Sequence, residues 1–583
     1  MASGRSPATT AAAVLAGSPL FAGLGAPTLQ RAAQACEPES IAGREWLFHQ
    51  DDPGDALYVV QSGRLEVLLE DTEPPALLRV AVRGDLVGEL SLMTGSARSA
   101  GVRAARDSRL LKMPATAFAE LLTDDDFAAG VTRYLASQLQ ANGRRQTTGT
   151  KQVRVLAVLS LHPDTAMTSE LLEEMRTALE RFGPSTVVAS DRHGAHDPAT
   201  VLDQVEHEHE YVVLIADGTD DDTVWDDFCL RQADQTLVLV DPRAPLPGEG
   251  LLRTLEGCDV AFCAPYPSTA RQGAWIDALK PRGRHLIRPS ELRDGVERMV
   301  RRLTGQSRGI VLSGGGARGF AHIGVLRGLL EAGVQIDRVG GCSMGSFVGA
   351  LFAKGMSAAE MREVCHRELV MSHPFNDYTL PTSALIKGRK AMAMFHRVLG
   401  STAIDELALD FFAVSADLVS AELVVHRRGP LFEAVAISMS IPGLAPPTIA
   451  GRRVLVDGGV LDNLPVATMA ETGEGPMIAV DVMGRRRLDA SRSLSVAPSW
   501  RDRITARLRG DLPAISEILV RTTVLGSWQT VERNKTLAEI VIAPDIADAG
   551  LLDFRELDRM IDAGRRAADA ALAAEVDALG MTI

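Results

Sequence analysis

Two glycine-rich turns lie close together in the chain, and both contain residues suited to ester chemistry. The second turn, Gly341-Cys342-Ser343-Met344-Gly345, is a G-x-S-x-G. In this pattern the glycines permit a strained strand-to-helix turn that exposes the serine hydroxyl at a helix N-terminus. The first turn, Gly314-Gly315-Gly316-Ala317-Arg318-Gly319, offers main-chain N–H groups that can hold an oxyanion. A serine nucleophile beside an anion cradle predicts acyl transfer.

The base for such a serine must come from elsewhere in the chain. Asp457 follows the apolar run 454–456 and precedes two glycines, so its carboxylate is expected to project from a strand end into a cleft. The last histidine, His426, precedes Asp457. We therefore expect a Ser–Asp dyad in which Asp457 is the general base for Ser343. A histidine triad is the competing interpretation, and its candidates lie outside recognisable turns: His366, His373, His396 or His426 with Asp377, Asp405, Asp410 or Asp417.

The first glycine turn also fits a second chemistry. A G-x-G-x-x-G after an apolar strand is typical of dinucleotide-binding loops, and Asp337 lies near the spacing of a ribose-binding acid. The serine turn follows within the same βαβ unit, so dinucleotide binding ranks second.

Three motifs in order, G-G-G-x-R-G, G-x-S-x-G and D-G-G, resemble the patatin-like phospholipase family over roughly residues 307–484. The segments 438–447 (SMSIPGLAPP) and 456–466 (VDGGVLDNLPV) are also similar to that family. The resemblance implies that Ser343 is the nucleophile and that Asp457 activates it. It also implies an oxyanion hole at the glycine loop, formed by amides of Gly315 and Gly316 with Gly314 nearby and stabilised by Arg318. The chain departs from the family at Ser313, where aspartate is frequent, and at Cys342, where threonine is common; neither change removes a catalytic group.

A further chemical segment spans residues 88–100, within a stretch of short alternating strands such as 56–61, 64–70 and 109–113. A buried arginine can hold a phosphate with two hydrogen bonds, and a carboxylate can accept from a ribose hydroxyl. The sequence pattern G-E-x-x-L followed by R-S-A resembles the phosphate-binding cassette of cyclic nucleotide-binding domains. The resemblance covers residues 19–140. It implies a cyclic nucleotide, cAMP or cGMP, on Gly88, Glu89, Arg98 and Ser99. The alternative is a β-roll that keeps the fold and has lost its ligand.

At 583 residues the chain is too long for one core. We predict a multidomain fold: a cyclic nucleotide-binding β-roll with flanking helices (1–150), a middle α/β domain without a recognised site (151–305), and an α/β/α patatin-like hydrolase domain with a C-terminal helical extension (306–583). Buried strands are expected at 153–159, 186–190, 211–216, 236–240 and 260–263. This order resembles the neuropathy-target-esterase-like architecture without its N-terminal membrane helix, and the segment 229–234 resembles the linker of that group.

Composition narrows the range of partners. A net charge of −14 argues against nucleic-acid binding, and the six cysteines lack the spacing of a zinc site or a disulfide framework. We expect a cytoplasmic protein with no transmembrane helix, no metal and no required cofactor. The acidic run 217–222 is interpreted as a solvated loop, with a metal site as the alternative. The basic run 485–509 is a candidate for a peripheral membrane surface, or equally for a solvated linker. The segment 385–397, which mixes methionines with cations, is a candidate lid or membrane-facing segment, with core packing as the alternative.

Together these features predict a serine esterase acting on acyl esters of phospholipids or lysophospholipids and regulated by a cyclic nucleotide. The alternative is a cyclic-nucleotide-responsive sensor or scaffold with a weak or inactive hydrolase domain. A lipid is the expected substrate, and nothing in the sequence indicates an oligomeric state.

Overall fold

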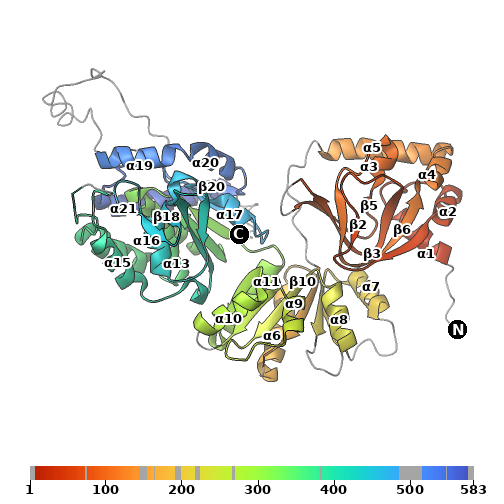
Figure 1. Ribbon diagram of the computed structural model, residues 1–583, viewed down its shortest axis with the longest axis horizontal. Coiled ribbons are helices and arrows are strands. Elements are labelled where there is room, and N and C mark those ends of the chain that lie inside the picture. Colours follow the sequence, from red (N-terminus) through yellow and green to blue (C-terminus); the bar gives the residue numbers. More distant parts are fainter. Residues whose placement is uncertain are drawn as a thin grey trace, which may run out of the picture. The chain divides into compact units, whose positions relative to one another are not determined.

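A computed structural model describes residues 7–71, 75–142, 154–162, 164–190, 198–216, 223–264, 269–380, 384–484, 515–546 and 548–574 (Figure 1). The chain forms two compact units. The first contains residues 1–240 with 258–260, and the second contains residues 241–257 with 261–583.

The first unit begins with an antiparallel β-roll, in which β3 and β6 are the long central strands. Its strands are β1 (Glu37–Ile41), β2 (Trp46–Phe48), β3 (Ala56–Leu69), β4 (Ala76–Ala81), β5 (Leu86–Val87) and β6 (Gly101–Pro114). Its helices are α1 (Pro7–Ala16), α2 (Ala26–Gln34), α3 (Glu89–Thr94), α4 (Ala115–Leu121) and α5 (Asp125–Asn142). Side chains alternate along β3: Leu57 and Val59 pack in the cluster shared with the helices, whereas Tyr58 and Val60 pack inside the roll.

One detail of the roll differs from the sequence-based expectation. The segments 56–61 and 64–70 were expected to be separate strands, but they form the single strand β3. Gly63, which lies between those two expected strands, takes φ +94° within β3, where the pairing with β6 shifts register. A glycine tolerates that φ without ending the strand.

A parallel sheet follows the roll, with strands in the order β10-β7-β9-β8 within the first unit. These strands are β7 (Val155–Ser160), β8 (Ser185–Val188), β9 (Tyr211–Ala216) and β10 (Gln235–Val240), and they coincide with the expected buried runs. The helices between them are α6 (Thr165–Leu179), α7 (Pro198–Glu208) and α8 (Thr223–Gln232). Two ion pairs join this sheet region to the roll: the buried Arg64–Asp234 at 2.8 Å and the partly buried Arg106–Glu206 at 2.6 Å.

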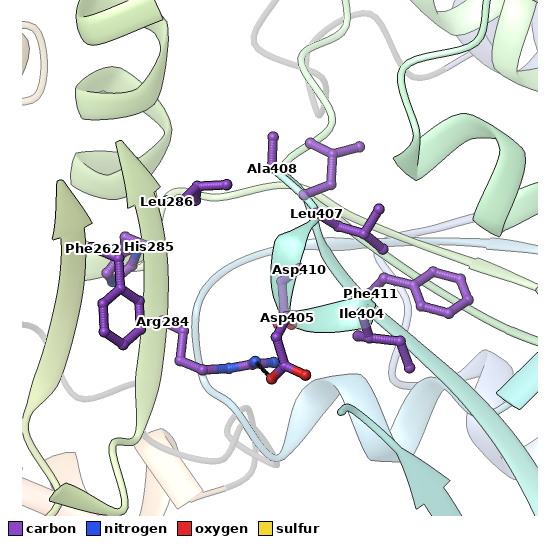
Figure 2. Close-up of a pocket in the computed structure, with 11 residues that line it drawn as sticks. Phe262, Arg284, His285, Leu286, Ile404, Asp405, Leu407, Ala408, Asp410 and Phe411 are labelled. Carbon is purple, nitrogen blue, oxygen red and sulfur yellow. Dashed lines mark hydrogen bonds and ion pairs between the residues drawn. The ribbon is translucent and has the colours of Figure 1, made fainter. Parts of the chain in front are cut away.

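Further along the chain lie α9 (Glu249–Thr254), β11 (Asp259–Cys263), α10 (Thr269–Leu279), β12 (Gly283–Ile287) and α11 (Leu292–Leu303). Strand β12 was not predicted. Within the second unit, Arg284 of β12 forms an ion pair with Asp405, and Figure 2 shows this pair beside a cavity of about 20 Å³. A cavity of that size holds one water molecule at most and no substrate.

The main sheet of the second unit has the order β17-β18-β15-β14-β13-β19-β20, with β16 paired to β15. Its strands are β13 (Gly309–Leu312), β14 (Arg338–Cys342), β15 (Asp410–Asp417), β16 (Leu423–His426), β17 (Thr448–Ala450), β18 (Arg453–Asp457), β19 (Met477–Val480) and β20 (Ile540–Ile542). Strands β13, β14, β15, β19 and β20 are parallel, whereas β16, β17 and β18 are antiparallel to their neighbours.

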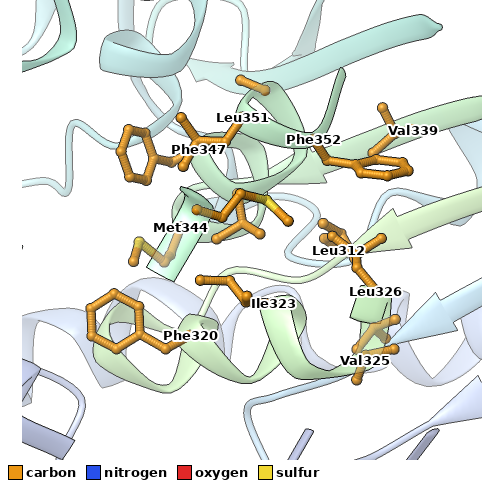
Figure 3. Close-up of a cluster of buried hydrophobic side chains, with 14 of the residues drawn as sticks. Leu312, Phe320, Ile323, Val325, Leu326, Val339, Met344, Phe347, Leu351 and Phe352 are labelled. Carbon is orange, nitrogen blue, oxygen red and sulfur yellow. The ribbon is translucent and has the colours of Figure 1, made fainter. Parts of the chain in front are cut away.

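Helices of the second unit bury an apolar core against this sheet. They are α12 (Ala321–Glu331), α13 (Met344–Ala353), α14 (Ala358–Cys365), α15 (Arg389–Leu399), α16 (Leu431–Ser438), α17 (Val466–Ala470), α19 (Ile515–Leu525), α20 (Trp528–Lys535) and α21 (Leu557–Ala574). Phe320, Met344 and Phe347 are fully buried in this core (Figure 3). The helix α21 lies tightly on α12, because a Cβ on Gly564 would come within 1.9 Å of the Ala321 oxygen.

Candidate active site

Ser343 stands in the turn between β14 and α13, at the carboxyl edge of the sheet. Its φ of +51° with ψ of −124° is a strained conformation for a residue with a side chain. The flanking glycines make the turn possible: a Cβ on Gly345 would lie 2.2 Å from the Leu312 oxygen, and one on Gly341 would lie 2.6 Å from the Gly345 carbonyl carbon. The G-x-S-x-G spacing thus reflects close backbone packing on both sides of the serine.

Asp457 comes to the same edge through the register of two strand pairs. Cys342 pairs with Val414 in the parallel β14–β15 ladder, and the next residue, Ser415, pairs with Asp457 in the antiparallel β15–β18 ladder. The Asp457 carboxyl accepts hydrogen bonds from the Ser343 hydroxyl, from the Gly459 N–H at 2.8 Å and from the Cys342 thiol at 3.5 Å. The structure therefore brings together the two residues that the sequence proposed as a dyad.

Burial sets the protonation behaviour of this aspartate. Asp457 is 2% exposed, and loss of hydration raises its pKa from 3.8 to about 6, although the three donors lower it in part. Its carboxylate is therefore ionised at neutral pH and has a proton affinity closer to that of a histidine than an exposed aspartate would have. Such a group can take a proton from a serine hydroxyl and return it to a leaving group.

The glycine loop lies beside Ser343, since a Cβ on Gly314 would be 3.1 Å from the Ser343 Cβ. The N–H of Gly314 donates to the Asn463 oxygen at 3.1 Å. No main-chain partner is found among the described residues for the N–H groups of Gly315 and Gly316. These two amides can hold an oxyanion, whereas the amide of Gly314, which the sequence grouped with them, is already engaged.

Arg318 and the C-terminal part of the chain fix the glycine loop. The buried Arg318 guanidinium donates to the Ala549 oxygen at 2.8 and 3.0 Å and to the Met483 oxygen. The Leu551 oxygen accepts from the Ala317 N–H at 2.8 Å and would lie 2.1 Å from a Cβ on Gly316, which has φ +56°. Arg318, itself a residue of the loop, thus anchors the loop to main-chain oxygens of the C-terminal part of the chain.

Further residues hold the site, and sequence reasoning did not single them out. The Ser438 hydroxyl accepts from the Ser343 N–H at 2.9 Å, and the Asn463 side-chain amide donates to the Gly314 oxygen at 3.1 Å. His322 is fully buried and donates through Nε2 to the Ser313 oxygen at 2.9 Å. Burial lowers the pKa of His322 to about 4, so it is neutral. Ser438 and Asn463 lie in the two segments quoted for the family resemblance, which was the available signal.

Most residues of the competing interpretations have partners away from Ser343. His426 hydrogen-bonds to Ser415 at 2.7 Å, and His396 packs its ring against Phe432. The aspartates paired with them bind other groups: Asp405 contacts Arg284, Asp410 contacts Arg427, Asp417 accepts from Val419, and Asp377 accepts from Gly388. Asp337, the ribose-binding candidate, forms a buried bidentate pair with Arg301. These contacts favour the dyad over a triad and over dinucleotide binding.

An apolar cavity of about 230 Å³ opens next to this site. Ser440 lines it, and the main-chain oxygen of Ser440 accepts the N–H of Asp457 at 2.9 Å. Its other walls include Phe375, Ile386, Phe395 and Met439, and Lys387 and Arg389 also line it. A pocket of this size lies just below the range of about 300–1,000 Å³ that encloses drug-sized ligands, so it suits one slender apolar chain.

In the first unit the cassette residues converge around Arg98. Its buried guanidinium donates to the Gly88 oxygen at 2.8 Å, to the Ser91 hydroxyl at 2.9 Å and to Asp55 at 3.0 Å. It also stacks 4.1 Å from the centre of the Phe48 ring. Gly88 has a positive φ of 78°, and a Cβ there would also come within 2.3 Å of the Arg98 guanidinium, so this position favours glycine on both counts.

The other two cassette residues differ in their surroundings. Glu89 is buried and accepts from the Tyr134 hydroxyl of α5 at 3.1 Å, whereas Ser99 is exposed. Asp55 and Tyr134 were not predicted from the sequence. Arg98 is a fixed, desolvated guanidinium of the kind that binds a phosphate.

Several other segments were singled out in the sequence. The acidic run 217–222 and the basic run 485–509 lie outside the described residues. In the described part of the chain no cluster of His, Cys, Asp or Glu is arranged to hold a metal ion, and no helix is long and apolar enough to cross a bilayer. The segment 385–397 is divided, since Met394 is buried in the core and Met392 is 42% exposed.

Two models of known protein families match this chain. The model of the patatin-like phospholipase family matches residues 310–470, and that of the cyclic nucleotide-binding domain matches residues 38–125. The chain is therefore a multidomain enzyme of the phospholipase and esterase class, with a cyclic nucleotide-binding fold ahead of a patatin domain.

Its relatives define the family more closely. The uncharacterized NTE family protein MT2641 of Mycobacterium tuberculosis is 33% identical over 98% of this chain and 97% of its own length. Human patatin-like phospholipase domain-containing protein 6 is 28% identical over 90% of this chain but only 43% of its own length. A solved N-terminal domain of a transcriptional regulator from Streptomyces coelicolor A3(2) is 29% identical over 22% of this chain and 92% of that chain, with a TM-score of 0.21. The chain belongs to the NTE family.

Proposed function

We propose that the chain hydrolyses acyl esters of phospholipids or lysophospholipids through a Ser343–Asp457 dyad. The observation that carries this proposal is the hydrogen bond from a serine in a strained, positive-φ turn to a buried carboxyl whose pKa is raised to about 6. The apolar cavity at Ser440 supports an acyl chain as the group that the site accommodates.

The mechanism has two halves. Ser343 Oγ attacks the ester carbonyl while its proton passes to Asp457, and the N–H groups of Gly315 and Gly316 stabilise the oxyanion. Collapse of the tetrahedral intermediate breaks the bond to the alcohol, which leaves with the proton from Asp457. Water then attacks the acyl-enzyme, loses a proton to Asp457 and releases the fatty acid, and Ser343 recovers its proton.

A fluorophosphonate probe tests this mechanism. We expect covalent labelling of the wild-type protein, none of Ser343→Ala, and undiminished labelling of Ser357→Ala, a serine that caps α14 away from the site. Equal labelling of wild type and Ser343→Ala would overturn the proposal. No labelling of the wild type would favour the alternative, a sensor or scaffold with an inactive hydrolase domain.

The regulatory part of the proposal concerns the cassette. A cyclic nucleotide, cAMP or cGMP, binds with its phosphate on Arg98 and Ser99 and its ribose on Glu89 beside Gly88. The buried guanidinium of Arg98 supports this role. Calorimetry is expected to show heat of binding for the wild type and for Arg133→Ala, an exposed arginine of α5, but not for Arg98→Ala. Absence of heat with either nucleotide would contradict this part alone.

The remaining proposals concern organisation. Residues 1–150 form the nucleotide-binding domain, residues 151–305 an α/β spacer, and residues 306–583 the hydrolase with its helical extension. The enzyme works in the cytoplasm at the surface of a membrane, and it requires no cofactor for ester hydrolysis.

A further inference from the structure

The mouth of the apolar cavity carries large apolar side chains that face solvent. Tyr378, Leu380 and Ile449 are 71%, 82% and 77% exposed. Isolated exposed apolar residues are ordinary on protein surfaces, but a group of them around one opening marks a contact site.

Main-chain pairing and sequence adjacency connect these three residues to the walls of the cavity. Tyr378 forms a β-bridge with Ile386, which lines the cavity, and the Thr379 N–H donates to the Leu385 oxygen at 3.0 Å. Leu380 is the next residue along this edge. Ile449 follows Thr448, which lines the cavity from the opposite segment. We call Tyr378, Leu380 and Ile449, with the cavity-lining Met392, Lys387 and Arg389, the mouth surface.

The mouth surface is positively charged, whereas the whole chain is negatively charged. The protein has a net charge of −14, yet Lys387 and Arg389 are exposed at the opening. No ion pair is recorded for either of them within the described residues. The nearby Asp377 directs its carboxylate to the main-chain N–H groups of Gly388 and Lys390. The rim therefore combines apolar side chains with cations that anionic groups can approach.

We infer that the mouth surface docks on a lipid bilayer that contains anionic headgroups. Tyr378, Leu380 and Ile449 enter the boundary between headgroups and acyl chains, and Lys387 and Arg389 contact the phosphates. The cavity then faces the bilayer, so an acyl chain can pass from the lipid to Ser343 without crossing water. This inference rests on the proposed esterase activity only for its consequence, because docking itself requires no turnover.

Sedimentation with vesicles tests the docking. We use the full chain with Ser343→Ala, so that the lipid stays intact, and vesicles of phosphatidylcholine alone or mixed with phosphatidylglycerol. Binding is expected to favour the anionic vesicles. Leu380→Asp with Ile449→Asp should weaken partitioning by about 10-fold or more. Lys387→Gln with Arg389→Gln should weaken it about 20-fold on anionic vesicles and little on neutral ones.

Val224→Asp is the matched control, because Val224 is 76% exposed but lies on α8 in the other unit. It should bind vesicles as the parent protein does. Equal binding by the Leu380/Ile449 variant and the parent would overturn the inference. So would a dimer that this variant converts to a monomer, since the mouth surface would then be an interface between two copies.

A soluble short-chain ester separates docking from catalysis. With Ser343 intact, Leu380→Asp with Ile449→Asp should hydrolyse this ester at the wild-type rate and lose activity only on vesicles. A wild type that binds vesicles and hydrolyses no ester would leave the docking intact and overturn the proposed function. A variant that loses both activities equally would show damage to the fold, and the less disruptive Leu380→Ser with Ile449→Thr would then replace it and must still lose vesicle binding.

Discussion

At the scale of single residues, the environment of Asp457 decides how the dyad behaves. Burial disfavours its ionised form, and the donors from Ser343, Gly459 and Cys342 recover part of that cost. A carboxyl with a pKa of about 6 is a better proton acceptor than an exposed aspartate, yet it is still ionised at neutral pH. This balance fits the proposed role of Asp457 as a general base without a histidine.

The pH dependence of turnover follows directly. We expect kcat/KM for a soluble ester to fall about tenfold per pH unit below an apparent pKa near 6, because only ionised Asp457 accepts the serine proton. A pH–rate profile measures this. A profile that stays flat down to pH near the ordinary aspartate value of 3.8 would contradict the assignment.

The contribution of Asp457 to stability should decrease as pH rises, whereas turnover should increase. A raised pKa in the folded state contributes stability below the unfolded pKa of 3.8, and that contribution is lost as pH rises through about 6. Asp457→Asn should therefore remove activity and raise the free energy of unfolding at pH 8 by about 1–3 kcal/mol, with a smaller gain in acid. Urea unfolding at two pH values measures the difference, and a variant destabilised at pH 8 would contradict this account.

Cys342 gives a second prediction at this scale. Its thiol donates to Asp457, and burial raises the pKa of the thiol well above its usual value, so it remains protonated as a donor. Cys342→Ala should move the acid limb of the pH profile upward by roughly half a unit, because a weak donor to the ionised form is lost. Cys342→Ser keeps a donor to Asp457, so its acid limb should lie much closer to that of the wild type. Cys365→Ala, at another buried cysteine of this unit, should leave the limb in place.

At the scale of elements, local spacing was predictable from the sequence and long-range register was not. The turns at Gly314 and Ser343 carry their own signature, because glycine is needed where backbones approach closely. The contacts of Ser438 and Asn463, and the clamp of Leu551 on the glycine loop, depend on segments far apart in the chain that meet only in the folded sheet. No periodicity in the sequence reports such meetings.

Helix α5 provides a prediction at this scale. Its Tyr134 hydroxyl donates a hydrogen bond to the Glu89 carboxyl, the group proposed to accept a ribose hydroxyl. Tyr134→Phe removes this competitor, and nucleotide affinity should rise about 2- to 10-fold, in line with the net worth of one hydrogen bond. Calorimetry with cAMP and cGMP measures the change, and Thr132→Ala on the exposed side of α5 is the control. Unchanged or weaker binding by Tyr134→Phe would show that the hydroxyl does not compete.

At the scale of the whole molecule, buried ion pairs tie parts of the middle segment to each functional region. In the first unit Arg64 of the roll pairs with Asp234, which lies in the stretch 229–234 that resembles the family linker. In the second unit Arg302 of α11 pairs with Glu474 before β19, at 2.7 and 3.0 Å. Residues of the middle segment thus pair with the roll in the first unit and with the hydrolase region in the second, and the domain boundaries at residues 150 and 305 stay sequence-based predictions.

The contribution of the Arg302–Glu474 pair to stability can be measured with two variants. Both side chains are about 95% buried, with exposures of 5% and 4%, so Arg302→Met leaves a buried carboxylate whose remaining cation among the described residues is the more distant Arg338, at 3.8 Å. We expect a loss of about 2–4 kcal/mol in the free energy of unfolding of the second unit, somewhat below the usual 3–5 for a broken buried pair, because Arg338 remains. Adding Glu474→Leu removes the unpaired charge and should recover most of that loss. Urea unfolding followed by tryptophan fluorescence measures both variants, and a double variant no more stable than the single one would show that the loss does not come from the unpaired Glu474 carboxylate.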